Sequence, residues 1–142
     1  DAPKLLGTDG RKMSKSYGNT ISLSEKPEAI RATAQKMFTD PLRIKMTDPG
    51  HPDACNVCGY WRLFAPGRAE RVWEECRTAK RGCVQNKQEL AEVLVGLTEP
   101  FRQARRRFDR AAVERILQDG AEKARAVAHQ TLSEVKRAFG LA

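Results

Sequence analysis

Apolar residues along most of the chain recur at helical spacing, beginning just after residue 23. The first run predicts a helix that starts near Ser24 and Pro27 and ends before Pro41. Its apolar face consists of Ile30, Ala34, Met37 and Phe38. Prolines and a glycine between residues 39 and 53 then predict a loop, which separates this helix from the next amphipathic segment.

Two further amphipathic segments follow this loop. The first is short, and its apolar positions are Val57, Tyr60, Trp61 and Phe64. The second is predicted to begin near Pro66 and to end near Gly82. One side of it carries Ala69, Val72, Trp73 and Cys76. Because aromatic residues at helical spacing usually pack in a core, we expect the tryptophans to be buried rather than to stack on nucleic-acid bases.

The strongest periodicity begins near Lys87 and predicts a long helix with a kink or break at Pro100. Its apolar positions are Leu90, Leu94, Leu97, Phe101, Ala104 and Phe108. A short helix ending at Gly120 is predicted next, with Val113, Ile116 and Leu117 facing inward. A last helix ends at Gly140 and presents Ala124, Ala128, Leu132, Val135 and Phe139. These patterns predict a mainly α fold with a helical bundle over residues 23–142.

Residues 1–22 have a different character from the rest of the chain. They are rich in Gly, Ser and Thr and show almost no helical periodicity, so we expect the end of a strand followed by a mobile loop. The sequence thus predicts two parts, residues 1–22 and residues 23–142.

Charge and composition narrow the classes of function. The net charge of +8, from 26 Lys and Arg against 18 Asp and Glu, favours a polyanionic partner, either nucleic acid or an anionic membrane surface. No apolar run approaches the roughly 18 residues of a membrane span. The first residue is Asp1 rather than Met, so we expect the gene product to begin upstream of it.

The run Lys12-Met13-Ser14-Lys15-Ser16 is the most informative feature for chemistry. Two lysines three residues apart in a glycine-flanked loop can place two ammonium groups on one polyphosphate. Attack on an α-phosphate, with pyrophosphate as the leaving group, builds negative charge that such cations stabilise. Flexible flanks would let the loop close over a nucleotide and reopen. Without further context, the alternative is a solvated surface turn.

The context is a resemblance that extends over essentially the whole chain. The run PKLLGTDGRKMSKSYGNTI resembles the signature loop of class I aminoacyl-tRNA synthetases. The segments KMFTDP, CRTAKRGCVQNKQELAEVL and GAEKARAVAHQTLSEVKRAFGL resemble the C-terminal portion of the tryptophanyl-tRNA synthetase family. That family has an N-terminal Rossmann-like catalytic domain with a HIGH-like motif, which does not occur here. The resemblance therefore implies that residues 1–22 end the catalytic domain and that residues 23–142 form a helical anticodon-binding domain.

The resemblance also implies roles for individual residues. Lys12 and Lys15 would bind the ATP phosphates and act in catalysis, with Lys15 the stronger candidate for transition-state stabilisation. Met13 and Ser14 would contact the nucleotide, and Ser16 would hold the loop and complete the ATP-binding set.

The function implied by the resemblance is ATP-dependent activation of tryptophan and transfer to tRNA(Trp), with Mg²⁺ accompanying ATP, in a cytoplasmic homodimer. This fragment alone is expected to be inactive, because half of the site is missing. Three alternatives remain open: another class I synthetase such as the tyrosyl type, a non-catalytic RNA-binding module that retains the loop, and a metal-sensing or redox protein built on the cysteines.

A cluster of arginines lies around the junction of the predicted long helix and the helix after it. At helical spacing, one stripe consists of Arg102, Arg105, Arg106 and Arg110. Such a stripe can face a phosphate backbone, and the family resemblance favours tRNA as that backbone. The alternative is an ordinary solvated face, balanced by nearby carboxylates.

Four cysteines fall in one short window, at positions Cys55, Cys58, Cys76 and Cys83. Four thiolates can hold zinc or a [4Fe-4S] cluster. Some members of the resembled family carry such a cluster, but here the expected fourth ligand position is Asn86 and the first spacing is shorter. We therefore expect four free thiols in preference to a metal site.

Overall fold

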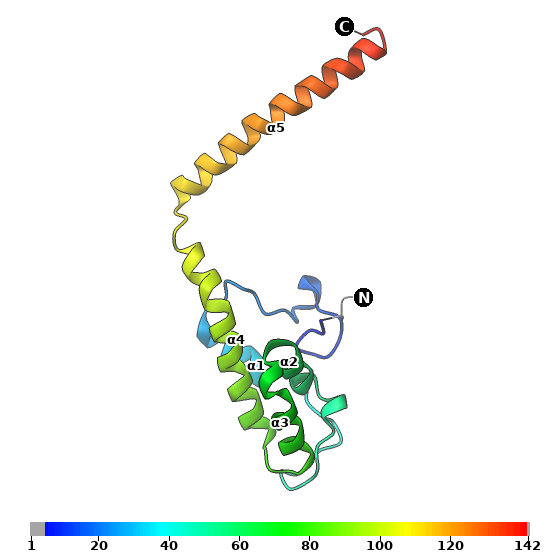
Figure 1. The fold of residues 1–142 in the computed structure, drawn as a ribbon, viewed down its shortest axis with the longest axis vertical. Coiled ribbons are helices and arrows are strands. Elements are labelled where there is room, and N and C mark those ends of the chain that lie inside the picture. Colours follow the sequence, from blue (N-terminus) through cyan, green and yellow to red (C-terminus); the bar gives the residue numbers. More distant parts are fainter. Residues whose placement is uncertain (1–4, 142) are drawn as a thin grey trace. The chain divides into compact units, whose positions relative to one another are not determined.

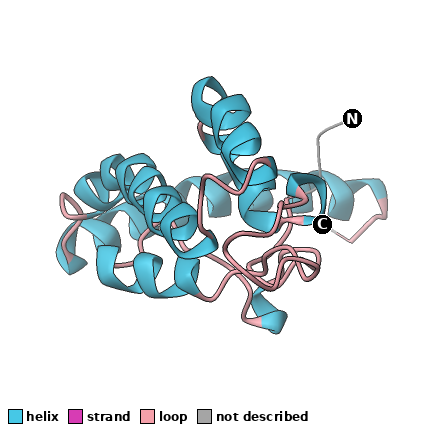
Figure 2. Ribbon diagram, turned by 90° about the horizontal axis from the view of Figure 1, so that it is seen from below, coloured by secondary structure: helices cyan, strands magenta, loops and turns pink. Residues whose placement is uncertain are grey.

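The computed structural model describes residues 5–141, and its regular elements are helical (Figures 1 and 2). The α-helices are α1 (Pro27–Gln35), α2 (Asn56–Phe64), α3 (Pro66–Arg77), α4 (Cys83–Arg105) and α5 (Arg110–Ala138). Two short 3-10 helices are η1 (Lys15–Tyr17) and η2 (Pro52–Ala54). Within residues 5–141 no strand forms, and the extended pairing there is one antiparallel bridge between Leu6 and Lys12. The predicted mainly α fold is confirmed.

The chain divides into two compact units, Asp1–Arg102 and Gln103–Ala142. The first unit contains α1 to α3 and most of α4, and the second contains the end of α4 and all of α5. Residues 5–22 pack within the first unit. The Asn56 side chain donates to the Gly7 carbonyl at 2.7 Å, and the Tyr60 hydroxyl donates to the Leu6 carbonyl at 2.5 Å. The predicted domain boundary near residue 22 stays a prediction.

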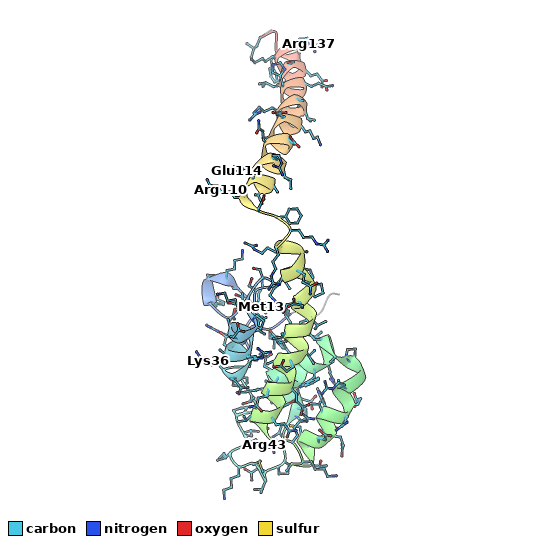
Figure 3. The ribbon with its side chains drawn as sticks, turned by 90° about the vertical axis from the view of Figure 1, so that its left-hand side faces the viewer. Met13, Lys36, Arg43, Arg110, Glu114 and Arg137 are labelled. Carbon is cyan, nitrogen blue, oxygen red and sulfur yellow. The ribbon has the colours of Figure 1, made fainter. Side chains whose placement is uncertain are left out.

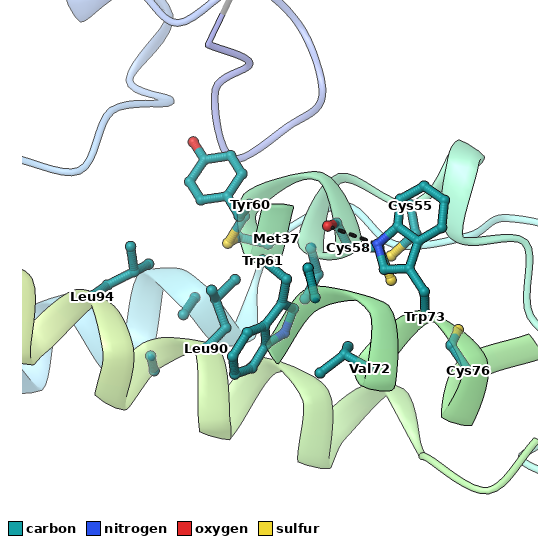
Figure 4. Close-up of a cluster of buried hydrophobic side chains, with 14 of the residues drawn as sticks. Met37, Cys55, Cys58, Tyr60, Trp61, Val72, Trp73, Cys76, Leu90 and Leu94 are labelled. Atoms are coloured by element: carbon teal, nitrogen blue, oxygen red, sulfur yellow. Dashed lines mark hydrogen bonds between the residues drawn. The ribbon is translucent and has the colours of Figure 1, made fainter. Parts of the chain in front are cut away.

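The core of the first unit forms where the apolar faces of α1 to α4 meet (Figure 4). Its largest fully buried side chains are Trp61, Ile30, Met37, Leu90, Val57, Val72 and Cys58. Both indoles are buried and hydrogen-bonded: Trp61 Nε1 donates to Asn86 Oδ1 at 2.7 Å, and Trp73 Nε1 donates to the Cys58 carbonyl at 3.2 Å. The expectation that the tryptophans pack in the core is confirmed. Asn86 occupies the position where the resembled cluster pattern would have its fourth cysteine. Here its side-chain oxygen accepts the hydrogen bond from the Trp61 indole.

Local sequence explains where the first helices begin and end. Pro27 and Pro66 occupy first-turn positions, where a missing N–H costs no hydrogen bond. The N-cap of α1 is Lys26 rather than the predicted Ser24. The helix ends at Gln35, so Phe38 lies beyond it and is partly exposed. On α3, the four residues predicted to face inward are the buried ones: Ala69, Val72, Trp73 and Cys76.

Helix α4 runs through Pro100 to Arg105, so of the predicted kink or break at Pro100, the break does not occur. Polar side chains bind the carbonyls of the preceding turn: Thr98 Oγ1 donates to the Leu94 carbonyl at 2.7 Å, and Arg102 Nη2 donates to the Val95 carbonyl at 2.8 Å. Both bonds lie near the proline, whose missing N–H removes the ladder bond to the Gly96 carbonyl. Only the first half of the predicted apolar face is buried, since Leu90 and Leu94 are buried while Phe101 is exposed.

Helix α5 is one continuous helix, and the two separate helices predicted around Gly120 are wrong. Gly120 lies inside it without a positive φ, and a glycine there costs only about 1 kcal/mol relative to alanine. Asp109 caps the start by accepting from the Ala112 N–H at 2.7 Å, and Gly140, at φ 68°, follows the end as predicted. None of its residues is buried, so the inward orientation predicted for its apolar residues is also wrong for this chain.

Candidate functional site

The segment that carries the two lysines is a tight loop, closed at its base by backbone hydrogen bonds. The Gly7 N–H donates to the Arg11 carbonyl at 2.6 Å, and the Met13 N–H donates to the Leu5 carbonyl at 3.3 Å. Gly10 at φ 80° turns the chain between these two sides, a conformation that suits glycine. The segment predicted to be mobile is therefore anchored at its base, and residues 14–18 form its outer part.

Both lysines lie on the exposed side of this loop. Lys12 belongs to the bridge with Leu6, and Lys15 begins η1, which Gly18 closes at φ 64°. Within the described part of the chain neither ammonium group makes a hydrogen bond or an ion pair. Two uncommitted cations three residues apart are available to bind an external anion.

The two serines on either side of Lys15 hold the shape of the outer loop. Ser14 Oγ and Ser16 Oγ share a hydrogen bond at 2.8 Å. The Met13 side chain points the other way and lines an apolar groove of about 320 Å³, together with Ile21, Tyr60 and Leu94. Met13 thus ties the loop to the helical core. Its side chain packs against the core rather than facing the exposed side of the loop, which leaves only its backbone for a nucleotide contact.

Asn19 is a site residue that the motif alone does not identify. It is 2% exposed, although its neighbours in the loop are exposed. Its side chain hydrogen-bonds to Ser14, Asp9 and Lys12. The bond from Asn19 and those from the backbone and guanidinium of Arg11 lower the pKa of Asp9 to about 2 against an opposing effect of burial. The sequence signal is weak: one asparagine after a glycine, close behind the motif.

The four predicted tRNA-binding arginines have different environments. Arg102 is 7% exposed, and its guanidinium donates to the Thr98 hydroxyl, the Val95 carbonyl and the Glu99 carboxylate. The other three belong to the second unit and are exposed: Arg105, Arg106 and Arg110. Arg110 pairs with Glu114 one turn further along α5, at 2.8 Å (Figure 3). Three of the four predicted tRNA-binding arginines are therefore exposed on the second unit.

Cys55 and Cys58, at the start of α2, interact with Cys76 of α3, and all four cysteines are free (Figure 4). The Cys58 thiol hydrogen-bonds to Cys55 and Cys76, which lowers the pKa of Cys55 to about 6 and that of Cys76 to about 7, although burial opposes both shifts. The same bonds raise the pKa of Cys58. Arg43 Nη1 lies 3.9 Å from Cys76 Sγ. This arrangement favours the thiolate form at Cys55 and Cys76 over Cys58.

Cys83 begins α4 and is half-buried, and burial raises its pKa. Among residues 5–141, no three His, Cys, Asp or Glu side chains are arranged to hold a metal ion. As placed, the four thiols do not fit a zinc or iron–sulfur site. In the same part of the chain, no helix has the length and apolar character needed to cross a membrane.

The sequence is similar to proteins of one known family. Residues 2–99 match a family described as tRNA synthetases class I (W and Y). The chain is 39% identical over 145 residues to the tryptophan–tRNA ligase of Aquifex aeolicus, covering 99% of this chain and 37% of that protein. It is 42% identical over 143 residues to the tryptophan–tRNA ligase of Thermotoga maritima, covering 98% of this chain and 44% of that protein. It spans about two fifths of these relatives' length.

Solved structures show the same similarity. The tryptophanyl-tRNA synthetase of Campylobacter jejuni, in complex with ADP and tryptophan, superposes with a TM-score of 0.87 at 25% identity. The superposition covers 99% of this chain and 44% of that one. The synthetase of Aeropyrum pernix matches over 71% of this chain, with a TM-score of 0.62 at 30% identity.

Proposed function

The chain belongs to the class I tRNA synthetases of the tryptophan and tyrosine family, and from this membership we propose that it is the carboxyl-terminal part of a tryptophan–tRNA ligase. The observation that carries the proposal is the exposed pair Lys12 and Lys15 on a loop whose base is anchored to the core. The matched relatives that carry the tryptophan name favour that amino acid over tyrosine.

In the proposed reaction, a tryptophan carboxylate oxygen attacks the α-phosphorus of ATP, and the bond to pyrophosphate breaks. Lys12 and Lys15 hold the phosphates and stabilise the charge that develops on the leaving pyrophosphate. Mg²⁺ bound to ATP would neutralise further phosphate charge. The backbone of Met13 and the hydroxyls of Ser14 and Ser16 would complete the nucleotide contacts. A terminal hydroxyl of tRNA(Trp) then attacks the carbonyl carbon of the adenylate, which forms the ester and releases AMP.

For tRNA we propose contacts from the exposed arginines Arg105, Arg106 and Arg110. Arginine suits phosphate oxygens because its planar guanidinium can donate two parallel hydrogen bonds. Arg102 carries the same charge, but its guanidinium already binds acceptors within the chain, so we assign it to the support of α4. Family membership further supports a cytoplasmic homodimer, which the mass of the full-length protein in solution tests.

The proposal is tested by pyrophosphate exchange into ATP with the full-length protein. We expect exchange that depends on tryptophan and not on tyrosine, and no exchange with the 142-residue chain alone. Exchange driven by tyrosine would support the tyrosyl alternative. If neither amino acid drives exchange while tRNA still binds, the protein is an RNA-binding module that keeps the loop without its chemistry.

For the cysteines we propose free thiols without a bound metal. The support is the interaction of Cys55, Cys58 and Cys76 with one another and the occupation of the fourth position by Asn86, which accepts from Trp61. Metal analysis of anaerobically purified protein should find neither iron nor zinc in stoichiometric amount, and chelator should leave the melting temperature unchanged. About four irons per chain with a visible absorption shoulder would overturn this assignment in favour of a cluster.

A further inference from the structure

The side chain of Asn19 spans the inside of the lysine loop. Its Oδ1 accepts from the Ser14 N–H at 2.8 Å, and its Nδ2 donates to the Lys12 carbonyl at 3.2 Å and to Asp9 Oδ1 at 2.7 Å. One amide therefore fixes the backbone of the first lysine and the residue just before the second. Asn19 thus holds the backbone on both sides of Met13.

Asn19 is itself held rigidly against the core. The Thr8 N–H donates to the Asn19 carbonyl at 2.9 Å. A Cβ added at Gly7 would lie 2.2 Å from Asn19 Nδ2, so the asparagine packs directly on bare backbone. The Gly7 carbonyl in turn accepts from Asn56 of α2. A continuous set of contacts thus leads from α2 through Gly7 to the amide of Asn19.

Asp9 closes the network on the opposite side of Asn19. One of its carboxylate oxygens accepts from Asn19 and from the Arg11 N–H, and the other pairs with the Arg11 guanidinium. That guanidinium also lies 4.6 Å from the centre of the Tyr17 ring, beyond Lys15. The amide of Asn19 is the central member of the network, because it bonds both to this carboxylate and to the backbone between the lysines.

We propose that Asn19 is the positioning residue of the loop: its amide sets the separation and direction of Lys12 and Lys15 on the ATP phosphates. The inference rests on the proposed function. The role requires two donors and an acceptor on a short planar group, which asparagine supplies and aspartate, serine or alanine does not. Asn19 touches no phosphate in this scheme, since its bonds are all made within the chain.

The first test is Asn19→Ala in the full-length protein, measured by tryptophan-dependent pyrophosphate exchange. Because misplacement of reacting groups by about 1 Å costs on the order of 100-fold in rate, we expect kcat to fall by about that factor. The KM for tryptophan should be unchanged. The matched control is Asn86→Ala, which removes an equally buried asparagine that binds Trp61 in the core. This control should lower the melting temperature but leave kcat unchanged below it.

The second test is Asn19→Asp, which keeps the acceptor for Ser14 and replaces the donor with an oxygen. Two carboxylates would then face each other, with Arg11 beside them and Tyr60 of α2 nearby. Like charges this close favour a shared proton, and a protonated carboxyl restores the bond to Asp9, one of the two that the amide donates. The kcat of this variant relative to wild type should therefore rise at least several-fold as the pH falls from about 8 to about 6.

The outcomes separate this inference from the proposed function. If wild type shows no tryptophan-dependent exchange, the proposed function fails. If wild type is active and folded Asn19→Ala keeps its kcat, the positioning role is wrong. If Asn19→Ala does not fold, the pH profile of Asn19→Asp decides: a flat ratio to wild type over the same pH range overturns the proposal, and a rising ratio supports it.

Discussion

The first unit and helix α5 have similar apolar periodicity but very different burial. Leu90 on α4 is 0% exposed, whereas Leu132 on α5 is 53% exposed. The first unit assembles α1 to α4 around two buried indoles, and no residue of α5 is buried. Periodicity of apolar residues predicts that a helix forms and which side is apolar. It does not show whether another element covers that side.

The difference extends to the charged groups. In the first unit, buried polar side chains bind the backbone, as Asn19 binds the lysine loop and Asp40 binds the loop before α2. In the described part of the second unit no acidic or basic residue is buried. The first unit is therefore suited to hold a fixed geometry, and the second offers exposed cations with few intramolecular partners.

The largest expected contrast is in stability. Replacing Trp61 with alanine in the 142-residue chain should lower the free energy of unfolding by about 3–5 kcal/mol, because it leaves a cavity and an unpaired Asn86. Replacing Leu132 with alanine should change it by less than about 0.5 kcal/mol, because the side chain is exposed. Urea unfolding followed by circular dichroism measures both. A cost for Leu132→Ala similar to that for Trp61→Ala would show that the α5 face is buried in the chain.

A smaller contrast is expected in tRNA binding. Changing Arg105, Arg106 and Arg110 to glutamine should weaken binding by roughly tenfold at low salt, and it should flatten the dependence of log Kd on log salt by about 0.9 for each phosphate that the protein no longer neutralises. Exposed arginines of the first unit, Arg68 and Arg71, pair with Glu89 and Glu75 and provide the control. If the slope of log Kd against log salt is the same in the triple variant and in wild type, these three arginines do not contact the RNA.

The smallest predicted effect concerns Asp40, which accepts hydrogen bonds from the Leu42 and His51 N–H groups and pairs with the His51 ring. Burial raises its pKa, but these bonds outweigh burial and leave it below 3.8. A lowered carboxyl pKa stabilises the fold above the ordinary value, and that contribution is lost as the pH falls below about 4. Asp40→Asn should cost about 1 kcal/mol at neutral pH and flatten the acid limb. Thermal melts from about pH 7 down to about pH 3 test this, and an unchanged acid limb would contradict it.

Much of the fold follows from the sequence because α1 to α3 and the first half of α4 bury most of the apolar residues that their periodicity predicts. The inward residues of α3 are the clearest case. The predicted helix end at Gly120 is wrong and no break occurs at Pro100, because the local cost of one glycine or proline does not end a helix that its neighbours favour. The prediction for the apolar face of α5 is also wrong, because local spacing contains no information about distant partners.

The candidate site is predictable from the sequence only where it depends on a local motif. Lys12 and Lys15 form a recognisable motif, and the structure leaves both exposed and unpaired within residues 5–141. The role of Asn19 depends on a loop that folds back so that residues five to ten positions apart meet. Such contacts have no periodicity. The gathering of Cys55, Cys58 and Cys76 likewise depends on how α2 meets α3, and their spacing alone leaves the ligand question open.

The central claim, that the anchored loop of the first unit presents a catalytic cation, is tested most directly by Lys15→Ala in the full-length protein. Tryptophan-dependent pyrophosphate exchange should fall by about 100- to 1,000-fold, the usual cost of removing one group that stabilises transition-state charge. Tryptophan affinity should be unchanged, and Lys45→Ala, another exposed lysine of the first unit, should leave both quantities unchanged. An exchange rate in Lys15→Ala equal to that of wild type would contradict the claim.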